Sequence, residues 1–180
     1  MMLNSIKVVT DIGRFSYVNV WEPKSMNNGD KKYSVSFIIL KSDKDTIKKI
    51  KEGIEQAKKE GISKFGGKIP DNLKIPLRDG DIDKPGDKAY VNSYFINANS
   101  NMKPGIVDKN VKPILDQSEF YSGCYGRASV VFYAYNSNGN KGIACGLQNL
   151  QKLRDGETLG GTSKPEDDFD VVELEDDFLN

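Results

Sequence analysis

The sequence of 180 residues contains no histidine and only two cysteines. Without histidine, the usual general base for a serine or cysteine nucleophile is missing, which argues against an enzyme of that kind. No cofactor motif is recognised, and two cysteines alone leave no credible zinc site. The hairpin register derived below separates Cys124 from Cys145 by many rungs, too far for a disulfide. We interpret both as small core residues in a reducing compartment.

Long apolar runs are missing as well. No run approaches the ~20 residues that a membrane span requires, so no membrane partner is expected. The first residues, MMLNSIKVV, lack the basic segment followed by a longer apolar one that marks a secretory signal. We therefore expect a cytoplasmic protein whose length suits one domain with a sizeable core.

Net charge is also absent, because 26 Lys and Arg balance 26 Asp and Glu. The distribution is uneven, since the stretch from Glu166 to Asn180 carries eight acidic side chains and no basic one. Residues 1–165 therefore hold 26 basic and 18 acidic side chains, an excess of eight positive charges. A basic body with an acidic tail indicates a polyanionic partner such as nucleic acid. The alternative is a tail that only improves solubility.

Among the features present, residues 126–149 predict a β-hairpin that turns at Asn138-Gly139. Both residue types tolerate the positive φ of a two-residue primed turn. In that register Phe132 faces Cys145 on an apolar face that reads as core. The opposite face sets large side chains beside small ones: Tyr133 beside Ala144, Tyr135 beside Gly142, and Val131 beside Gly146.

That second face has two interpretations. A flat ring with open space beside it is what a stacked nucleobase needs. Equally, an aromatic ring stabilises a strand by covering a glycine, or packs beneath a second layer. The hairpin alone does not decide between them.

The rest of the chain predicts a mainly β protein. β-prone segments lie at 3–21, around Gly13 and ending at Pro23, and at 31–41 and 89–99. One amphipathic helix is expected from an N-cap at Ser42 to about Glu60, with an apolar stripe at Ile47, Ile50, Ile54 and Ala57. Five or six mostly antiparallel strands, one helix and long loops favour an OB-fold-like Greek-key barrel over a sandwich. The barrel is expected over residues 1–160 and a disordered acidic tail over 161–180.

Single-stranded nucleic acid is bound by a basic groove with exposed aromatic rings. Tyrosines are spread through the predicted strands and interleaved with Lys and Arg, and the rings of Tyr133, Tyr135, Tyr94 and Trp21 are the first choices for base stacking. Arg127 and Lys141 bracket the hairpin and suit phosphate contacts. The full set of expected DNA-binding residues is Arg14, Tyr17, Trp21, Lys24, Lys88, Tyr90, Tyr94, Arg127, Tyr133, Tyr135 and Lys141.

The tail is expected to do more than keep the protein soluble. A tethered polyanion has a high effective concentration at a basic groove and should compete with DNA there. When DNA displaces the tail, its charges and apolar end form a peptide for basic pockets on partner proteins. The expected partner-binding residues are Glu175, Asp176, Asp177 and Phe178.

The main alternative is a metal-dependent nuclease or resolvase. Asp79, Asp81 and Asp83 alternate in the segment LRDGDIDKPGD and could hold Mg²⁺ or Ca²⁺. The calcium-loop pattern fails there, because Lys84 and Tyr90 stand where Gly and Glu are needed. A solvated turn explains the same residues, and a non-catalytic protein is the prediction.

Several segments resemble one known family in order along the body: SYVNVWEPK (16–24), KYSVSFIILKSDKDT (32–46), PLRDGD (76–81), KPGIVD (103–108), YSGC (121–124) and FYAYNSNGNKGIACGLQNLQKLRDGE (132–157). The chain resembles the single-stranded DNA-binding proteins of phages of Gram-positive bacteria. The resemblance implies an OB-type fold and sequence-independent coating of single strands during phage replication or recombination. It gives no residue-level contact list, and association into a homo-oligomer is compatible with it.

Overall fold

The structure is a computed structural model that describes residues 5–25, 29–159 and 168–173. Its strands are β1 (Ser5–Val9), β2 (Gly13–Ser25), β3 (Lys31–Leu40), β4 (Leu77–Asp79), β5 (Ser93–Ser100), β6 (Gly105–Val107), β7 (Tyr125–Ser137) and β8 (Asn140–Arg154). The helices are α1 (Lys44–Glu60) and the one-turn α2 (Gly80–Asp83). Three short 3₁₀ turns lie at η1 (Ile62–Phe65), η2 (Lys88–Tyr90) and η3 (Gln117–Glu119).

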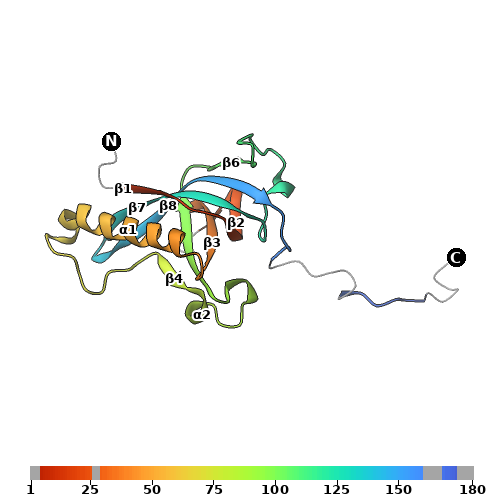
Figure 1. Cartoon of the computed structure of the whole chain (residues 1–180), viewed down its shortest axis with the longest axis horizontal. Helices are drawn as coiled ribbons and strands as arrows, with labels where there is room; N and C mark the ends of the chain where they lie inside the picture. Colours follow the sequence, from red (N-terminus) through yellow and green to blue (C-terminus); the bar gives the residue numbers. More distant parts are fainter. Residues whose placement is uncertain (1–4, 26–28, 160–167, 174–180) are drawn as a thin grey trace.

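Five of these strands close into a barrel (Figure 1). β2 pairs antiparallel with β3 and β7, β3 with β5, and β7 with β8. The ring closes where β5 meets β8 in parallel, at Asn99 and Gly146. This mixed, closed arrangement confirms the OB-like Greek-key barrel, in which only full closure removes the open edges of the sheet. The described residues form eight strands, more than expected, because β1, β4 and β6 add to the barrel's borders.

The hairpin prediction is confirmed in detail. Asn138 and Gly139 both have positive φ, +53° and +88°, as a primed turn requires. Phe132 pairs with Cys145 and Tyr133 with Ala144, in the predicted register. Both cysteines are free and buried, as expected.

One core cluster joins buried side chains of all five barrel strands to those of α1, which packs on β1 and β7 (Figure 1). Ile47, Ile50, Ile54 and Ala57 are buried on one helix face, which confirms the predicted stripe. Gly53 lets α1 approach the barrel, because a β-carbon there would stand 2.9 Å from a methyl of Val8. No helix among the described residues is both long and apolar enough to cross a bilayer.

Three local predictions are wrong. The helix N-cap is Asp43, not Ser42, since its carboxylate accepts the N–H of Thr46 at 3.1 Å. Pro23 does not end β2, which continues to Ser25, and Pro23 lies where the pairing with β3 is irregular, between Asn19 and Lys24. An irregular strand lacks regular ladder bonds, and proline is tolerated there. The third is the start of β5, which begins at Ser93 because the preceding residues form η2.

Candidate nucleic-acid interface

A row of small polar residues crosses the outer face of the barrel. The register places Asn19 of β2 opposite Ser34 of β3, and Ser34 opposite Asn99 of β5. Asn99 in turn meets Gly146 of β8. Neighbouring strands bring such residues together because side chains at every second position share one face of a sheet. Because these side chains are short, the row forms a shallow polar surface, here called the floor, with larger side chains at both ends.

At one end of the floor lies a cavity of about 440 Å³, here called the basic groove. Residues from β3, β4, β5, β7 and β8 and from the segment before β4 line it, and no acidic residue is among them. A site with cations and no carboxylate in its lining favours an anionic ligand. The polar and aromatic residues of the lining are Lys32, Lys74, Arg78, Asn97, Asn99, Tyr133 and Tyr135.

Two backbone hydrogen bonds between segments that are far apart in the sequence fix one wall of the basic groove. The N–H of Ile143 donates to the carbonyl of Lys74 at 2.9 Å, and the N–H of Lys74 to the carbonyl of Lys141 at 3.3 Å. These bonds attach the segment before β4 to the start of β8. The Lys74 side chain is thereby brought beside the tyrosines of β7.

Tyr135 lies directly over Gly142. A β-carbon built on Gly142 would stand 2.6 Å from the Tyr135 hydroxyl and 2.9 Å from the β-carbon of Lys74. The ring thus covers a strand glycine, which was one interpretation of this face, and it also lines the basic groove, as the other requires. Tyr133 is half-buried beside it, and burial raises the pKa of its phenol. A phenol that stays protonated adds no negative charge to repel phosphate.

At the other end of the floor, Tyr17 marks a second hollow of about 410 Å³, here called the bulge groove. The β2–β3 pairing slips between Ser16 and Asn19, and Tyr17 takes a φ of +47° there. Such a conformation is strained for a residue with a bulky side chain, and strain of this kind gathers at functional positions. Tyr17 is 55% exposed, with the ammonium of Lys84 4.9 Å from the centre of its ring. Lys24 lines the same hollow.

Two of the expected DNA-binding tyrosines, Tyr90 and Tyr94, are not on this face. Tyr90 is 1% exposed, and its hydroxyl hydrogen-bonds to Ser36 Oγ at 2.9 Å, so the prediction that it binds DNA is wrong. Tyr90 ends η2, and its ring packs in a buried cluster with Ile38 and Phe95. Burial there raises the pKa of its phenol. Tyr94 belongs to the opposite face of β5 from Asn97 and Asn99, and it packs against the main core.

The remaining expected residues have structural contacts of their own. The indole N–H of Trp21 donates to the carbonyl of Phe120 at 3.0 Å, and its ring packs on the core. Arg127 and Lys141 donate to the backbone carbonyls of Thr10 and Phe65. Arg14 and Lys88 both line a third cavity, together with Tyr125 and Arg154. Their DNA-binding roles stay predictions, as do those of Tyr17, Lys24, Tyr133 and Tyr135.

The expected set lacked five residues of the basic groove: Lys32, Lys74, Arg78, Asn97 and Asn99. The exposure of Asn97 and Asn99 could have been predicted, because they alternate with the apolar, buried residues Ile96 and Ala98 along β5. Lys74 gave no such signal, since its place depends on an isolated bridge to Gly142. A contact between distant segments leaves no periodic pattern in either one.

The structure gives no support to the nuclease alternative. Lys41 Nζ lies 2.9 Å from Asp79 and 2.8 Å from Asp81, and Arg78 pairs with Asp83 at 2.9 Å. The hydrogen bond from Lys41 holds the pKa of Asp81 below its ordinary value. Within residues 5–25, 29–159 and 168–173, no three His, Cys, Asp or Glu side chains gather as a metal site. The three carboxylates serve as ion-pair partners around α2.

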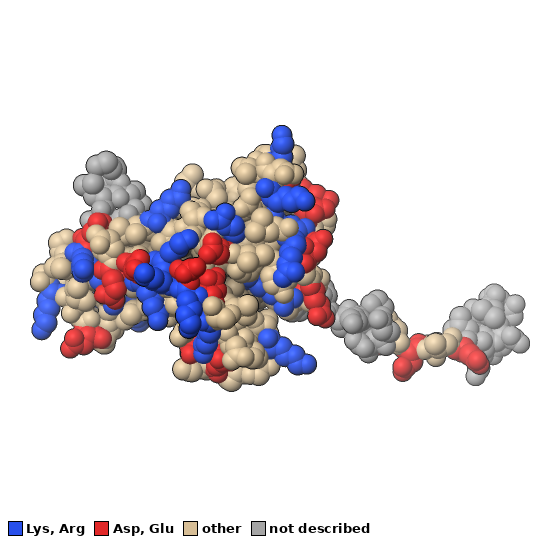
Figure 2. Space-filling model, viewed as in Figure 1, with Lys and Arg blue, Asp and Glu red and all other residues tan. Residues whose placement is uncertain are grey.

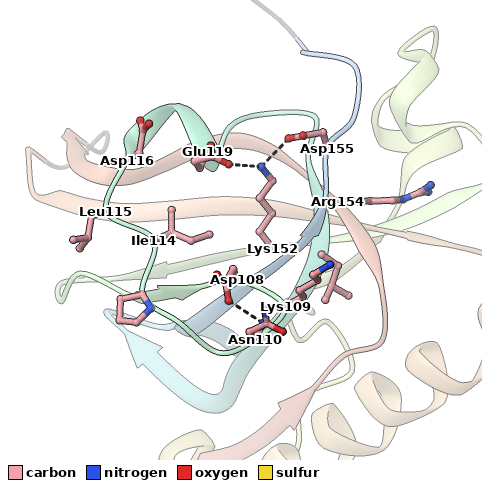
Figure 3. Close-up of a pocket in the computed structure, with 12 residues that line it drawn as sticks. Asp108, Lys109, Asn110, Ile114, Leu115, Asp116, Glu119, Lys152, Arg154 and Asp155 are labelled. Atoms are coloured by element: carbon pink, nitrogen blue, oxygen red, sulfur yellow. Dashed lines mark hydrogen bonds and ion pairs between the residues drawn. The ribbon is translucent and has the colours of Figure 1, made fainter.

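Another cavity lies where β8 ends, and its charges are mixed (Figure 3). The ammonium of Lys152 points between Glu119, at 3.2 Å, and Asp155, at 2.7 Å. Tyr121 also donates its hydroxyl to Asp155 at 2.9 Å. These contacts fix the exit of the chain from the barrel, and the carboxylates around them make the cavity a poor site for phosphate.

Charge on the surface follows the division seen in the sequence (Figure 2). On the face shown, Lys and Arg are scattered over the barrel with acidic residues between them, whereas the charged residues of the described tail segment 168–173 are all acidic. The expected partner-binding residues lie outside the described residues: Glu175, Asp176, Asp177 and Phe178.

A closed barrel with a polar outer floor, tyrosine rings and a basic groove defines an OB-type protein, a class that uses this face for oligonucleotides or oligosaccharides. Residues 6–179 match the family described as Enterobacter phage Enc34, ssDNA-binding protein. The chain belongs to this family. It is also 34% identical over 183 residues to protein p50 of Acyrthosiphon pisum secondary endosymbiont phage 1, covering 95% of this chain and 98% of that protein.

Solved structures share the fold. The single-stranded DNA-binding protein of bacteriophage Enc34, in complex with ssDNA, has a TM-score of 0.73 at 24% identity, over 87% of this chain and 90% of that one. The single-stranded DNA-binding protein gp2.5 of bacteriophage T7 has a TM-score of 0.62 at 16% identity, over 91% and 92%. The family is thus that of a phage protein, while the expected Gram-positive host stays a prediction.

Proposed function

We propose that this protein binds single-stranded DNA without sequence preference and coats it during phage replication or recombination, in the cytoplasm of the host. The observation that carries the proposal is the basic groove, whose lining combines Lys32, Lys74 and Arg78 with Tyr133 and Tyr135 and holds no carboxylate. Family membership supports the same ligand.

The geometry suits an unpaired strand better than a duplex. Phosphates are expected beside the three cations, and bases against the tyrosine rings and over the Asn and Ser floor. Rings accept any base because every base has a π-face, so stacking gives affinity without sequence preference. Asn97 and Asn99 offer amide groups that adapt as donor or acceptor to different base edges.

The nucleic acid is expected to run from the basic groove across the floor to the bulge groove. Tyr17 and Lys24 repeat there the pairing of ring and cation found at the first end. Asp87 in that lining makes the bulge groove the weaker of the two for phosphate.

The acidic tail completes the proposal. Residues 161–180 act as a separate segment that competes with DNA for the basic body and, when displaced, recruits replication or recombination proteins through Glu175, Asp176, Asp177 and Phe178. The body over residues 1–160 is the DNA-binding domain, and no catalytic step is assigned to it.

A titration of labelled oligo-dT at several salt concentrations tests the proposal. Log K should fall linearly with log salt, with a slope of about −0.7 for each phosphate neutralised on a single strand. A duplex of the same length should bind more weakly. Flat salt dependence or equal affinity for the duplex would reject single-strand binding, and cleavage of the DNA with Mg²⁺ or Mn²⁺ would revive the nuclease.

A further inference from the structure

The third cavity has a volume of about 340 Å³ and lies next to the bulge groove. The two are consecutive along β2, because Ser16 lines the bulge groove and Arg14 lines the third cavity. These residues are two positions apart on one strand, which corresponds to about 7 Å. The small, half-buried side chain of Ala89 in η2 borders both cavities. The third cavity is therefore continuous with the nucleic-acid face.

The charged residues of the third cavity are all positive. Arg14, Lys88 and Arg154 line it, and no acidic residue does. The ion pairs among the described residues involve none of these three side chains. Arg14 donates to two backbone carbonyls, at 3.1 and 2.7 Å, and both guanidinium groups lie near the centre of the Tyr125 ring, at 5.2 and 4.3 Å. Neutral partners position these charges without cancelling them, so the cavity favours an anionic ligand.

The same cavity gathers exposed aliphatic side chains, and we call it the apolar groove. Ile12, Leu40 and Val91 line it and are 47%, 60% and 51% exposed. Large aliphatic side chains left in water within one cavity indicate a surface that a ligand covers. Nucleobases suit this lining, because their flat faces pack against aliphatic side chains as well as against aromatic rings.

The strand β3 connects the three grooves and gives the length of the path. Its even-numbered residues share the outer face, where Lys32 lines the basic groove and Leu40 lines the apolar groove. Eight positions of a strand extend about 27 Å. That distance corresponds to roughly eight nucleotides at the 3.4 Å spacing of bases in a duplex strand, and to fewer when the strand is extended.

The first two grooves occupy only part of this path. Ser36 of β3 pairs with Ser16, which lines the bulge groove. From Lys32 to Ser36 the strand extends about 14 Å, or roughly four nucleotides at the same spacing. An acidic peptide would also match the charges of the apolar groove, but continuity with the nucleic-acid face favours DNA as its occupant.

We infer that single-stranded DNA continues from the bulge groove over Ala89 into the apolar groove, which is its third contact. Phosphates lie at the three cations of this groove, and bases pack on its three exposed aliphatic side chains. The inference rests on the proposed function and extends it, because a short oligonucleotide fills the first two grooves and only a longer one reaches the third. Affinity then increases with DNA length in two stages.

Titration of the full-length protein with labelled dT5 and dT15 tests this third contact. Lys88→Ala combined with Arg154→Ala removes two phosphate partners. For dT15, the slope of log K against log salt should become shallower by about 1.4, at about 0.7 for each phosphate, whereas the slope for dT5 should not change. The matched control combines Lys48→Ala with Lys49→Ala, two exposed residues of α1 outside all three linings, and should leave both slopes unchanged.

Leu40→Ser tests the apolar contact without changing the charge. It should weaken dT15 binding severalfold and leave dT5 binding as it is, with no change in the salt slope because no phosphate partner is lost. Leu115→Ser is the control, since Leu115 is 87% exposed and lies outside the three linings. Thermal unfolding of both variants checks that they remain folded.

The comparison of the two oligonucleotides decides the inference. Equal losses for dT5 and dT15, no loss for either, or an equal loss in the Lys48 and Lys49 control would overturn it. Tighter binding of dT15 by the Lys88 and Arg154 variant would also overturn it, because an acidic competitor would then occupy the groove. Failure of the native protein to bind either oligonucleotide would instead reject the proposed function itself, so the two failures are distinct.

Discussion

At the scale of single residues, substitutions of the tyrosine rings in the basic groove distinguish base stacking from a purely structural packing role. Tyr133→Ala should weaken oligo-dT binding by about 1–3 kcal/mol, the range for loss of one base stack. Tyr133→Phe should bind like the native protein, because stacking needs the ring and not the hydroxyl. Fluorescence titration measures the affinity, and thermal unfolding of each variant serves as the control. Equal affinity of the alanine variant would mean that Tyr133 only packs.

The cations of the same groove should act through salt dependence. Lys74→Ala removes one phosphate partner, so the slope of log K against log salt should become shallower by about 0.7. Lys48→Ala is the matched control, since its side chain is 74% exposed on α1, away from the groove lining. An equal change of slope in both variants would show that Lys74 contributes only general charge.

Which residues could be foreseen depended on how local their contacts are. Tyr133, Tyr135 and their small partners followed from the Asn138-Gly139 turn, because a hairpin register depends on neighbouring sequence. Tyr90 was misplaced because η2 interrupts an apolar run that reads as strand. Lys74 was out of reach, since its backbone bonds to Lys141 and Ile143 join segments that no local pattern connects.

At the scale of elements, the turn between β7 and β8 sets the register that positions both tyrosines. Gly139 has a φ of +88° and no heavy atom within 4 Å of a would-be β-carbon, so Gly139→Ala meets strain and no clash. The substitution should lower stability by about 1 kcal/mol, seen as a lower Tm in thermal unfolding. Asn140→Ala, one position later in regular strand geometry, is the control. An unchanged Tm in Gly139→Ala would mean that the turn relaxes freely.

The end of β8 depends on an ion pair whose strength should follow pH. The hydrogen bonds from Lys152 and Tyr121 hold the pKa of Asp155 below its ordinary value. Burial lowers the pKa of Lys152, but its bonds to Asp155 and Glu119 outweigh burial and raise that pKa overall. A depressed carboxyl pKa stabilises the fold above the unfolded pKa, and this contribution disappears as pH falls through the folded pKa.

The expected result is a small loss of Tm in Asp155→Asn at neutral pH that shrinks below about pH 4, the ordinary range of an aspartate. The loss is small because the Asp155 side chain is 76% exposed and water screens the pair. Thermal unfolding of both proteins from neutral to acidic pH measures it. A difference that grows on acidification would contradict the assigned ion pair.

At the scale of the whole molecule, a protein with no net charge still divides into a basic barrel and an acidic end. The barrel was predictable as a class, because its strands, its single long helix and its loops have recognisable patterns. Its closure was not, since the parallel meeting of β5 and β8 rests on one pair, Asn99 and Gly146. That pair also completes the polar floor, so fold closure and the nucleic-acid face depend on the same contact.

Removal of residues 166–180 should tighten oligo-dT binding, because the tethered carboxylates no longer compete with phosphate for the cations of the barrel. The gain should be largest at low salt and should shrink as salt screens the tail. A full-length protein in which Asn and Gln replace the eight acidic residues of that stretch is the matched control, and it should bind as tightly as the truncated protein. If only truncation tightens binding, the tail obstructs the barrel by its bulk, and competition by charge is excluded.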